Sequence, residues 1–471
     1  MYGLQTLNFD FGLRLTFRWV FVLADAVHPI IASNFLSYFT LDVKMFSSPV
    51  LRLSIISTIY VLSSNVYSNT AWLIAVVDSP SPTVDSAAFS SAQQNDSELV
   101  AFRENHRFLL FNARQGSLLS GPLSELFTTV PVPVGGSVLA AAGIIASSFA
   151  PDVTWLTVTL GAMHGLGLGT VTTMLQVLIS MYFQRYRGAA NGIMFAGSTA
   201  SAFIFSHLLL YFKDTYGFRG SLLVFGGVLM NMVALSLAFK EPHWVRRDRI
   251  KRRTGLQGTR RPSIFTTGLE QGAKKVPATA AVLRNIRGVL KCAMMYVLVI
   301  TSLAFSYNYD IFFSTIVDFA MDKGIPLENT VSFITYTSIT DLVGRVVFPT
   351  FTDRGLLQRS TLMILNYFLL GLCIISLPFC ESYWVLLAAC LGAALFLGCA
   401  ITMQSVLMAQ YLGIEKLAAG YTVLGGLCGP ALLAKAPFVG FFRDDLGSYN
   451  EMFWVLGSFS FFQIKRLTVK C

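Results

Sequence analysis

Long apolar runs are the feature that most constrains how this chain can fold. A helix that crosses a membrane needs about 20 consecutive, mostly apolar residues. The sequence contains nine such runs, at 133–150, 154–181, 188–212, 219–239, 292–317, 328–350, 360–379, 383–408 and 416–441. Of the 471 residues, 54% are hydrophobic and only 13% are charged, so a water-soluble fold would lack the polar residues to cover its surface. The sequence therefore predicts an all-α, multi-pass membrane protein.

One loop accounts for the net positive charge of the whole chain. Between Lys240 and Lys291 there are 14 Lys and Arg residues against three acidic residues, a net charge of +11, whereas the whole chain has +10. The remainder sums to −1, which gives no support for a nucleic-acid partner. Loops rich in Lys and Arg stay on the cytoplasmic side, so we predict a cytoplasmic linker. Contact with anionic lipid headgroups is the alternative.

The chain divides at this loop into two halves. We predict an N-terminal helical bundle over 1–239, the basic cytoplasmic loop over 240–291 and a C-terminal helical bundle over 292–471. Two bundles of about six helices joined by a long loop match the architecture of major facilitator carriers, in which repeated bundles surround a site near the middle of the membrane. The expected fold is thus a major facilitator fold with about twelve transmembrane helices in two six-helix bundles. The helices beyond the nine clear runs are expected before residue 110 and after residue 449, where the apolar stretches are broken or short.

Small residues in two of the apolar runs predict close packing between helices. The two sets, each spaced by four residues, are Gly161, Gly165 and Gly169, and Gly188, Gly192 and Ala196. Each set lies on one helix face, where the lack of large side chains lets a second helix approach.

The seven cysteines and five histidines are scattered along the chain. None of them has the spacing of a metal or redox site, and no Ser/His/Asp set or carboxylate pair suggests hydrolysis. The sequence therefore predicts neither an enzyme nor a metal site.

The stretch YTSITDLVGRVVFPTFTDRG places two full charges inside an apolar run. Asp341 and Arg345 are four residues apart, so they share one helix face, and the acid-before-base order favours an ion pair. Ionisable groups within a membrane mark an ion or substrate path more often than not. Arg offers a planar fork that matches a carboxylate, whereas a buried Asp can take up a proton because desolvation favours its neutral form. We predict that Arg345 binds an anion when Asp341 binds a proton; a pair that only locks helix packing is the alternative.

The stretch MYFQRYRGAANGIMFAGS, at 181–198, resembles the monocarboxylate transporters of the major facilitator superfamily. Members carry Tyr-Phe, a basic cluster, then Ala-Asn-Gly and Ala-Gly at the start of the fifth helix. Asp341 and Arg345 look like that family's eighth-helix pair, which binds the proton and the substrate carboxylate. The stretches GIEKLAAG, GPALL and FFRDDLGSYNEMF are similar to the family's eleventh helix and its exit into the twelfth. The resemblance covers roughly residues 121–453.

Further residues are predicted to serve the same site or its gate. The substrate- or proton-binding candidates are Asp341, Arg345, Arg52, Arg185, Arg187, Tyr307 and Lys435. Asp353 and Arg354, in FTDRGLLQRS, resemble the facilitator loop motif that clamps the closed cytoplasmic face, so they are the predicted gating residues. For the candidate cations outside the pair, the alternatives are a side chain that extends to the membrane interface or an anchor of the topology. Tyr307 shares the stretch AFSYNYD with Tyr309 and Asp310, which are predicted to line the cavity with it; for the tyrosines, aromatic packing is the alternative.

The first two helices and the last helix depart from the family pattern. An Asp-Gly-Gly-Trp-like entry to helix one is missing, so helix one is not placed. A polar stretch at about 78–116 interrupts helix two, and it cannot cross hydrocarbon because its backbone groups would lack partners. This stretch is either a loop in water or an artefact of the gene model. The last apolar run, MFWVLGSFSFFQI, has only about 13 mostly apolar residues, which is short for a membrane span.

The predicted function is secondary active transport, namely proton-coupled symport of small, lactate- or pyruvate-like monocarboxylates by alternating access, with the proton as coupling ion and no cofactor. One alternative is uniport of larger carboxylates, such as aromatic amino acids or thyroid-hormone-like molecules, because family members of that kind share these motifs. Another is a degenerate membrane protein that does not transport. The resemblance implies a plasma-membrane location and a small carboxylate and the lipid bilayer as partners. It leaves open whether a single-span chaperone glycoprotein is also a partner.

Overall fold

The computed structural model describes residues 6–9, 17–20, 57–58, 60, 116–118, 120–124, 127, 130–151, 153–239 and 278–468. Arg52, the expected region of helix one and nearly all of the polar stretch at 78–116 lie outside the described residues. The same holds for the part of the basic loop that precedes residue 278. The chain divides into two compact units, Met1–Arg52 and Leu53–Cys471.

The first unit contains a two-stranded antiparallel sheet. Strand β1 (Thr6–Phe9) pairs with β2 (Phe17–Val20) in the register Thr6↔Val20, Leu7↔Trp19, Asn8↔Arg18 and Phe9↔Phe17. Aromatic and β-branched residues, which favour strands, are frequent in both segments. The sequence predicted helices only, so this strand pair is an addition to the predicted fold.

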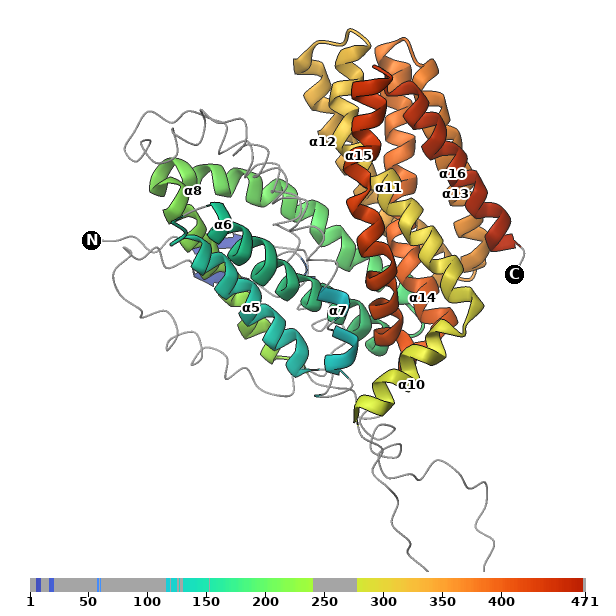
Figure 1. The fold of residues 1–471 in the computed structure, drawn as a ribbon. Coiled ribbons are helices and arrows are strands. Elements are labelled where there is room, and N and C mark those ends of the chain that lie inside the picture. Colours follow the sequence, from blue (N-terminus) through green and yellow to red (C-terminus); the bar gives the residue numbers. More distant parts are fainter. Residues whose placement is uncertain are drawn as a thin grey trace, which may run out of the picture. The chain divides into compact units, whose positions relative to one another are not determined.

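In the second unit, one group of helices lies between residues 131 and 237. The helices are α5 (Pro131–Ser147), α6 (Val153–Leu156), the π-helix η2 (Thr157–His164), α7 (Gly165–Tyr182) and α8 (Arg187–Leu237). Helix α8 covers two predicted spans, and Gly217 separates them with a φ of 70°, which glycine adopts without a steric penalty. Figure 1 shows α5, α7 and α8 beside one another, and their buried side chains share one hydrophobic core.

A second group of helices in the same unit follows from residue 278 onward. The helices are α10 (Ala278–Leu290), α11 (Ala293–Asp322), α12 (Leu327–Asp353), α13 (Arg359–Ser376), the 3-10 helix η3 (Leu377–Phe379), α14 (Tyr383–Leu433), α15 (Lys435–Gly440), the π-helix η4 (Phe441–Asp445) and α16 (Asn450–Thr468). Helix α14 joins two predicted spans across Gly413, which has a φ of 72°. All nine predicted spans are therefore helical.

Several of these helices can cross a membrane. Among the described residues, five stretches are long and apolar enough: Thr154–Tyr182, Arg219–Leu237, Ala293–Asp322, Arg359–Phe379 and Tyr383–Asp445. Helix α5 is a shorter apolar helix. Helix α16 has 19 residues, but it is not among the stretches that are long and apolar enough to cross. It is longer than the apolar run of about 13 residues because polar residues continue the helix at both ends.

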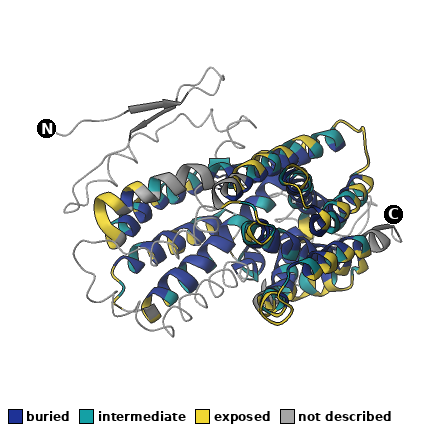
Figure 2. Ribbon diagram, turned by 90° about the horizontal axis from the view of Figure 1, so that it is seen from above, coloured by how far each residue is buried: buried dark blue, intermediate teal, exposed yellow. Residues whose placement is uncertain are grey.

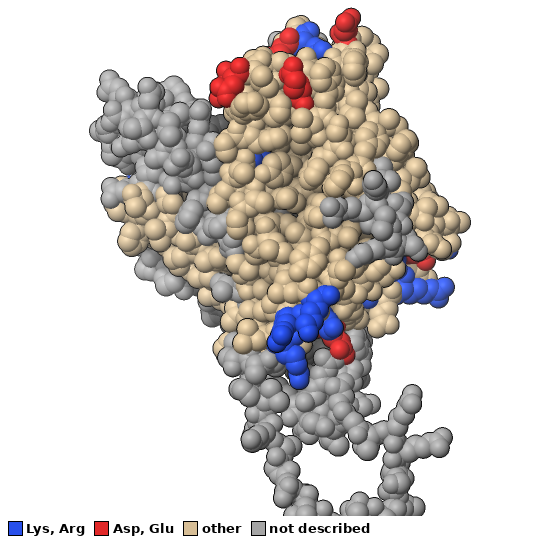
Figure 3. Space-filling view, turned by 45° about the vertical axis from the view of Figure 1, so that its right-hand side comes forward, with Lys and Arg blue, Asp and Glu red and all other residues tan. Residues whose placement is uncertain are grey.

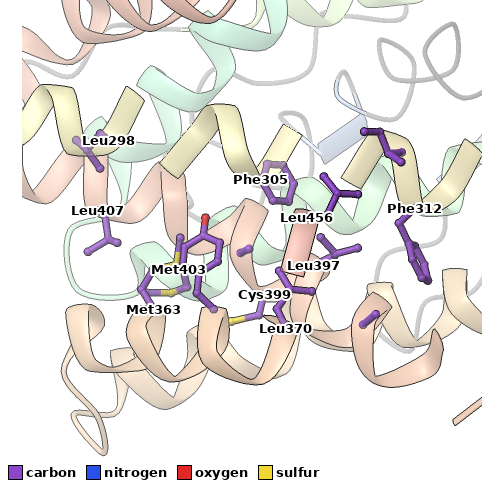
Figure 4. Packing of buried hydrophobic residues seen from close by; sticks show 14 of the residues in the cluster. Leu298, Phe305, Phe312, Met363, Leu370, Leu397, Cys399, Met403, Leu407 and Leu456 are labelled. Carbon is purple, nitrogen blue, oxygen red and sulfur yellow. The ribbon is translucent and has the colours of Figure 1, made fainter. Parts of the chain in front are cut away.

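The core of the second group is built mainly from α11, α13, α14 and α16. Figure 4 shows part of it, in which Met363 and Leu370 of α13 lie beside Met403 and Cys399 of α14. In Figure 2 the buried residues follow the sides of helices that face other helices, whereas exposed residues gather on outer sides and at turns. Large apolar residues such as Trp384 are exposed on those outer sides, which suits contact with lipid.

Helix α12 is held between α8 and α14 by glycines. A Cβ atom at Gly192 of α8 would lie 2.4 Å from the backbone oxygen of Arg345, which no real side chain allows. On the other side of α12, a Cβ at Gly398 of α14 would lie 2.1 Å from the backbone oxygen of Asp341. The predicted small-residue face around Gly188 and Gly192 is thus confirmed as a close helix contact. It brings α8 directly onto the turn of α12 that carries Asp341 and Arg345.

Candidate substrate and proton site

Asp341 and Arg345 form a buried ion pair, as the sequence predicted. Both residues lie in α12, both are only 1% exposed, and Arg345 Nη2 is 2.7 Å from Asp341 Oδ2. Their spacing of one helical turn places the two side chains on the same face of α12. Transferring two charges out of water is costly, and their attraction offsets that cost only where further hydrogen bonds satisfy both groups.

Helix α8 supplies those further hydrogen bonds. Thr199 Oγ1 donates to Asp341 Oδ2 at 3.1 Å. Arg345 Nη1 donates to the backbone oxygen of Phe195 at 2.7 Å and to the hydroxyl oxygen of Ser198. The ion pair therefore links the two helix groups. The sequence did not single out these α8 residues, although they follow the Ala-Asn-Gly motif at positions that share one helix face.

Helix α11 completes the surroundings of the guanidinium. Arg345 Nη2 donates to the hydroxyl oxygen of Tyr309 at 2.9 Å, and the Tyr309 ring lies 5.9 Å from the guanidinium carbon. The sequence predicts Tyr307 as a binding residue as well. Its hydroxyl donates instead to the backbone oxygen of Ala431 at 2.6 Å, and its ring packs on Phe438. Residues two apart on a helix point to different sides, so only one of the two tyrosines can reach the ion pair.

Two buried atoms of the pair keep free hydrogen-bonding capacity. In the part of the chain that the structure describes, Asp341 Oδ1 and Arg345 Nε have no hydrogen-bond partner. A buried unpaired acceptor or donor is unfavourable, so such atoms call for an explanation beyond packing. A carboxyl oxygen can take up a proton, and a guanidinium N–H can bind an anion. The arrangement thus suits the joint binding of a proton and an anion.

A second ion pair lies close to the first along α11. Lys435, the first residue of α15, places its Nζ 2.8 Å from Asp310 Oδ2. The Lys435 side chain is 21% exposed and that of Asp310 is 32% exposed, so this pair is only partly buried. Asp310 directly follows Tyr309 in the sequence. The structure therefore joins Lys435 to α11 rather than to Arg345.

Asp353, one of the two predicted gating residues, lies where the end of α12 meets the start of α8. Asp353, at the end of α12, accepts a hydrogen bond from the backbone N–H of Ala189 at 2.7 Å and another from Arg359 Nη2 at 3.5 Å. Its carboxylate thus caps the N-terminus of α8, where the helix dipole favours negative charge. Arg187 Nη2 donates to the backbone oxygen of Ser180 at 3.2 Å. Arg187, the first residue of α8, is itself buried.

Three other predicted residues are placed differently. Arg185 and Arg354 are exposed, and the structure does not bring either of them to the ion pair. Arg52 lies outside the described residues. Within the described ranges, no group of three or more His, Cys, Asp and Glu side chains could hold a metal ion.

A helical membrane protein whose two helix groups meet at a buried pair of opposite charges has the architecture of a secondary transporter. The model of the family described as Major Facilitator Superfamily matches residues 116–437. The match covers more than half of the chain, and the chain belongs to the Major Facilitator Superfamily.

Within this superfamily, the chain is similar to monocarboxylate transporters. The chain is 26% identical to Monocarboxylate transporter 12 of Homo sapiens over 349 aligned residues. The alignment covers 73% of this chain and 66% of that protein. It is 26% identical over 347 residues to Monocarboxylate transporter 3 of Rattus norvegicus, covering 72% of this chain and 66% of the relative. The chain thus matches slightly less than two thirds of the length of each of these relatives. Its resemblance to the monocarboxylate transporters is confirmed.

Solved structures share the fold. The fucose:proton symporter of E. coli superposes with a TM-score of 0.61 at 14% identity, covering 89% of this chain and 98% of the symporter. A proton:xylose symporter superposes with a TM-score of 0.64 at 13% identity, covering 88% and 95%. These similarities establish the predicted major facilitator fold. The chain is accordingly a multi-pass membrane protein of a transporter family, and the relatives are transporters rather than enzymes.

Proposed function

We propose that this protein is a secondary active transporter that moves a small monocarboxylate together with a proton. The observation that carries the proposal is the buried Asp341–Arg345 pair at the contact between α8 and α12. Its charges, its burial and its position between two helix groups are those expected of a coupled binding site. The curated relatives are named as monocarboxylate transporters, which supports the substrate class.

Charge balance gives the coupling a physical basis. With Asp341 ionised, the pair is neutral, and an added substrate carboxylate alone would leave a buried negative charge. Such an uncompensated charge costs several kcal/mol, about 3 to 5 in measured cases. A proton on Asp341 restores neutrality and releases the Arg345 guanidinium for two-point binding of the substrate carboxylate. Proton and anion therefore enter together.

The hydrogen bonds to α8 connect this exchange to alternating access. Arg345 holds the backbone oxygen of Phe195 and the hydroxyl of Ser198, so a substrate that competes for the guanidinium loosens the link between the two helix groups. At the end of α12, Asp353 on the N-terminus of α8 acts as a clamp that must open for the other side to become accessible. In this proposal, Arg185, Arg187 and Arg354 belong to the same clamp, because they lie beside the start of α8 or the end of α12.

Lys435 and Tyr307 have secondary roles in the proposal. Lys435 is paired with Asp310 yet partly exposed, so it can exchange its partner for the substrate carboxylate on the way to Arg345. Tyr307 fixes α11 against Ala431, just before the break between α14 and α15, and thereby sets the place of Lys435.

Uptake into vesicles tests the function directly. The full-length protein is reconstituted, and uptake of labelled lactate, pyruvate and larger carboxylates is measured with and without an inward proton gradient. We expect a small monocarboxylate to accumulate above its outside concentration only when the gradient is present. Equal uptake with and without the gradient would contradict proton coupling, and uptake of only the larger carboxylates would contradict the substrate class.

We further propose that the protein resides in the plasma membrane and that its delivery depends on a single-span glycoprotein. Surface labelling in cells with and without a co-expressed panel of such glycoproteins tests this. Increased surface abundance with one of them is the expected result. Equal abundance throughout, with normal uptake, would remove the partner from the proposal.

A further inference from the structure

Helix α10 lies at the boundary between membrane and water. Only Lys291 and Cys292 separate it from α11, which begins at Ala293 and is long and apolar enough to span a membrane. One face of α10 packs on α14, and Val289 on that face is fully buried. A helix in this place presents its other face to the headgroup region of the bilayer.

The exposed face of α10 mixes large apolar and basic side chains. Leu283 is 67% exposed and Leu290 is 38% exposed. Arg284, Arg287 and Lys291 are exposed on the same face. Two exposed leucines among three cations suit neither bulk water nor hydrocarbon alone. They suit an interface, where the leucines enter the acyl region and the cations remain at the phosphates.

Helix α14 adds a fourth cation to this face. A Cβ atom at Gly288 of α10 would lie 3.8 Å from Lys416 Nζ, so the exposed Lys416 side chain reaches the α10 backbone. The exposed neighbour Glu415 contributes one negative charge, so the cluster keeps a clear positive excess. Figure 3 shows this group of basic side chains gathered at one end of the unit.

Acidic side chains gather at the opposite end of the same unit. Exposed acidic residues there are Asp322, Glu381, Asp444, Asp445 and Glu451, against the exposed cation Arg443. Figure 3 shows several red groups and a smaller blue group at that end. Basic residues concentrate on the cytoplasmic side of membrane proteins. The α10 end therefore faces the cytoplasmic leaflet, whose anionic lipids carry a negative surface potential.

We propose that the exposed face of α10, together with Lys416, binds the headgroups of anionic phospholipids in the cytoplasmic leaflet. Arg284 and Arg287 hold phosphate oxygens through their planar guanidinium groups, with Lys291 and Lys416 as additional point charges. Leu283 and Leu290 insert beside the acyl chains. The binding does not depend on which substrate the transporter carries, so it stands apart from the proposed function.

The test uses the full-length protein in phosphatidylcholine vesicles with increasing phosphatidylserine, and it measures the thermal unfolding midpoint. The midpoint is expected to rise as phosphatidylserine is added. In the variant Arg284→Gln/Arg287→Gln/Lys291→Gln, each lost cation should weaken the apparent lipid affinity about fivefold, and all three together up to about a hundredfold. Unchanged affinity in this variant would overturn the proposal.

Two further variants separate charge from folding. Arg284→Lys/Arg287→Lys/Lys291→Arg keeps the charges, so it should retain most of the response, and a loss as large as in the glutamine variant would overturn the electrostatic account. Leu283→Ser/Leu290→Ser should weaken the response while leaving the midpoint in pure phosphatidylcholine unchanged. An unaltered response in this variant would exclude insertion of the leucines.

Soluble phosphate distinguishes a lipid surface from a free anion. Inorganic phosphate in phosphatidylcholine vesicles should not raise the midpoint at moderate salt, because free phosphate brings no acyl chain for the leucines. A rise equal to that caused by phosphatidylserine would reject the membrane as the partner. None of these measurements requires transport, so they remain valid if the uptake experiments fail.

Discussion

Two ion pairs of nearly equal length differ in what surrounds them. Arg345 and Asp341 approach to 2.7 Å and their side chains are only 2% exposed, whereas Arg443 and Asp318 approach to 2.8 Å with side chains 50% and 41% exposed. The first pair is hydrogen-bonded to α8 across the boundary between the two helix groups. The second joins α11 to η4 within one group. The N–O distance of an ion pair therefore does not indicate its role. Its burial and the elements that it joins do indicate that role.

The Lys435–Asp310 pair stands between these extremes. Its length is 2.8 Å, and its side chains are 21% and 32% exposed. Buried pairs lose several kcal/mol when one partner is removed, whereas exposed pairs contribute about 0 to 1 kcal/mol. The three pairs therefore form a graded series, and substitutions along it test whether burial sets their importance.

The largest effect is expected for Arg345→Gln. It leaves the Asp341 carboxylate buried without its cation, a change that costs about 3 to 5 kcal/mol. Surface abundance should fall steeply and uptake should be lost. The matched control is Asp341→Asn/Arg345→Gln, which removes both charges and should recover abundance without uptake. Normal uptake by Arg345→Gln would refute the role of this residue in substrate binding.

Asp341→Asn leaves the Arg345 charge buried without its counter-ion, so surface abundance should fall here too, although less than in Arg345→Gln. The Arg345 guanidinium keeps hydrogen bonds to Phe195, Ser198 and Tyr309 after the substitution. The amide cannot titrate, so an inward proton gradient should no longer accelerate uptake even where anion binding persists. Uptake at two external pH values, normalised to surface abundance, measures this. Proton-stimulated uptake in a well-folded variant would rule out Asp341 as the proton site.

A smaller effect is expected for Lys435→Gln. Partial exposure lets water screen the unpaired Asp310, so abundance should remain near normal. Loss of an entry contact for the anion should raise KM several-fold and leave the maximal rate largely intact. The exchange Asp310→Lys/Lys435→Asp restores an ion pair in the opposite sense. Full recovery of KM in that double variant would mean that the pair serves only to join α11 and α15.

The smallest effect is expected for Asp318→Asn. The pair with Arg443 is about half exposed, and such pairs contribute at most about 1 kcal/mol. Uptake and thermal unfolding midpoint should both stay close to those of the unaltered protein. A loss comparable to that of Arg345→Gln would show that burial does not order the three pairs.

Local spacing made much of this site predictable. Asp341 and Arg345 are one helical turn apart, and helix geometry alone places side chains at this spacing next to each other. The glycines Gly188 and Gly192 likewise predicted a close helix contact, and in the structure α12 packs against them. The membrane spans were predictable because an apolar run of sufficient length has no other stable place than the bilayer core.

Contacts between distant segments were not predictable in the same way. Nothing in the order of residues selects Tyr309 over Tyr307, because both lie in one apolar helix and only the packing of α11 against α12 decides which one reaches Arg345. The partner of Lys435 is 125 residues earlier in the chain, and the capping of α8 by Asp353 spans 164 residues. Such pairings carry no local signal.

The amino-acid sequence by itself determined that this chain is a helical membrane protein, where most of its spans lie and which two charges share a helix turn. Hydrophobic length and the helical repeat act within a few residues of one another, so they can be read along the chain. Only the tertiary structure decided that the Asp341–Arg345 pair bridges two helix groups, that Thr199, Ser198 and Tyr309 are its partners, and that Lys435 belongs to Asp310. The reason is physical: a buried charge is satisfied by whichever polar groups packing brings within hydrogen-bond distance, and packing depends on the shapes of all the helices together.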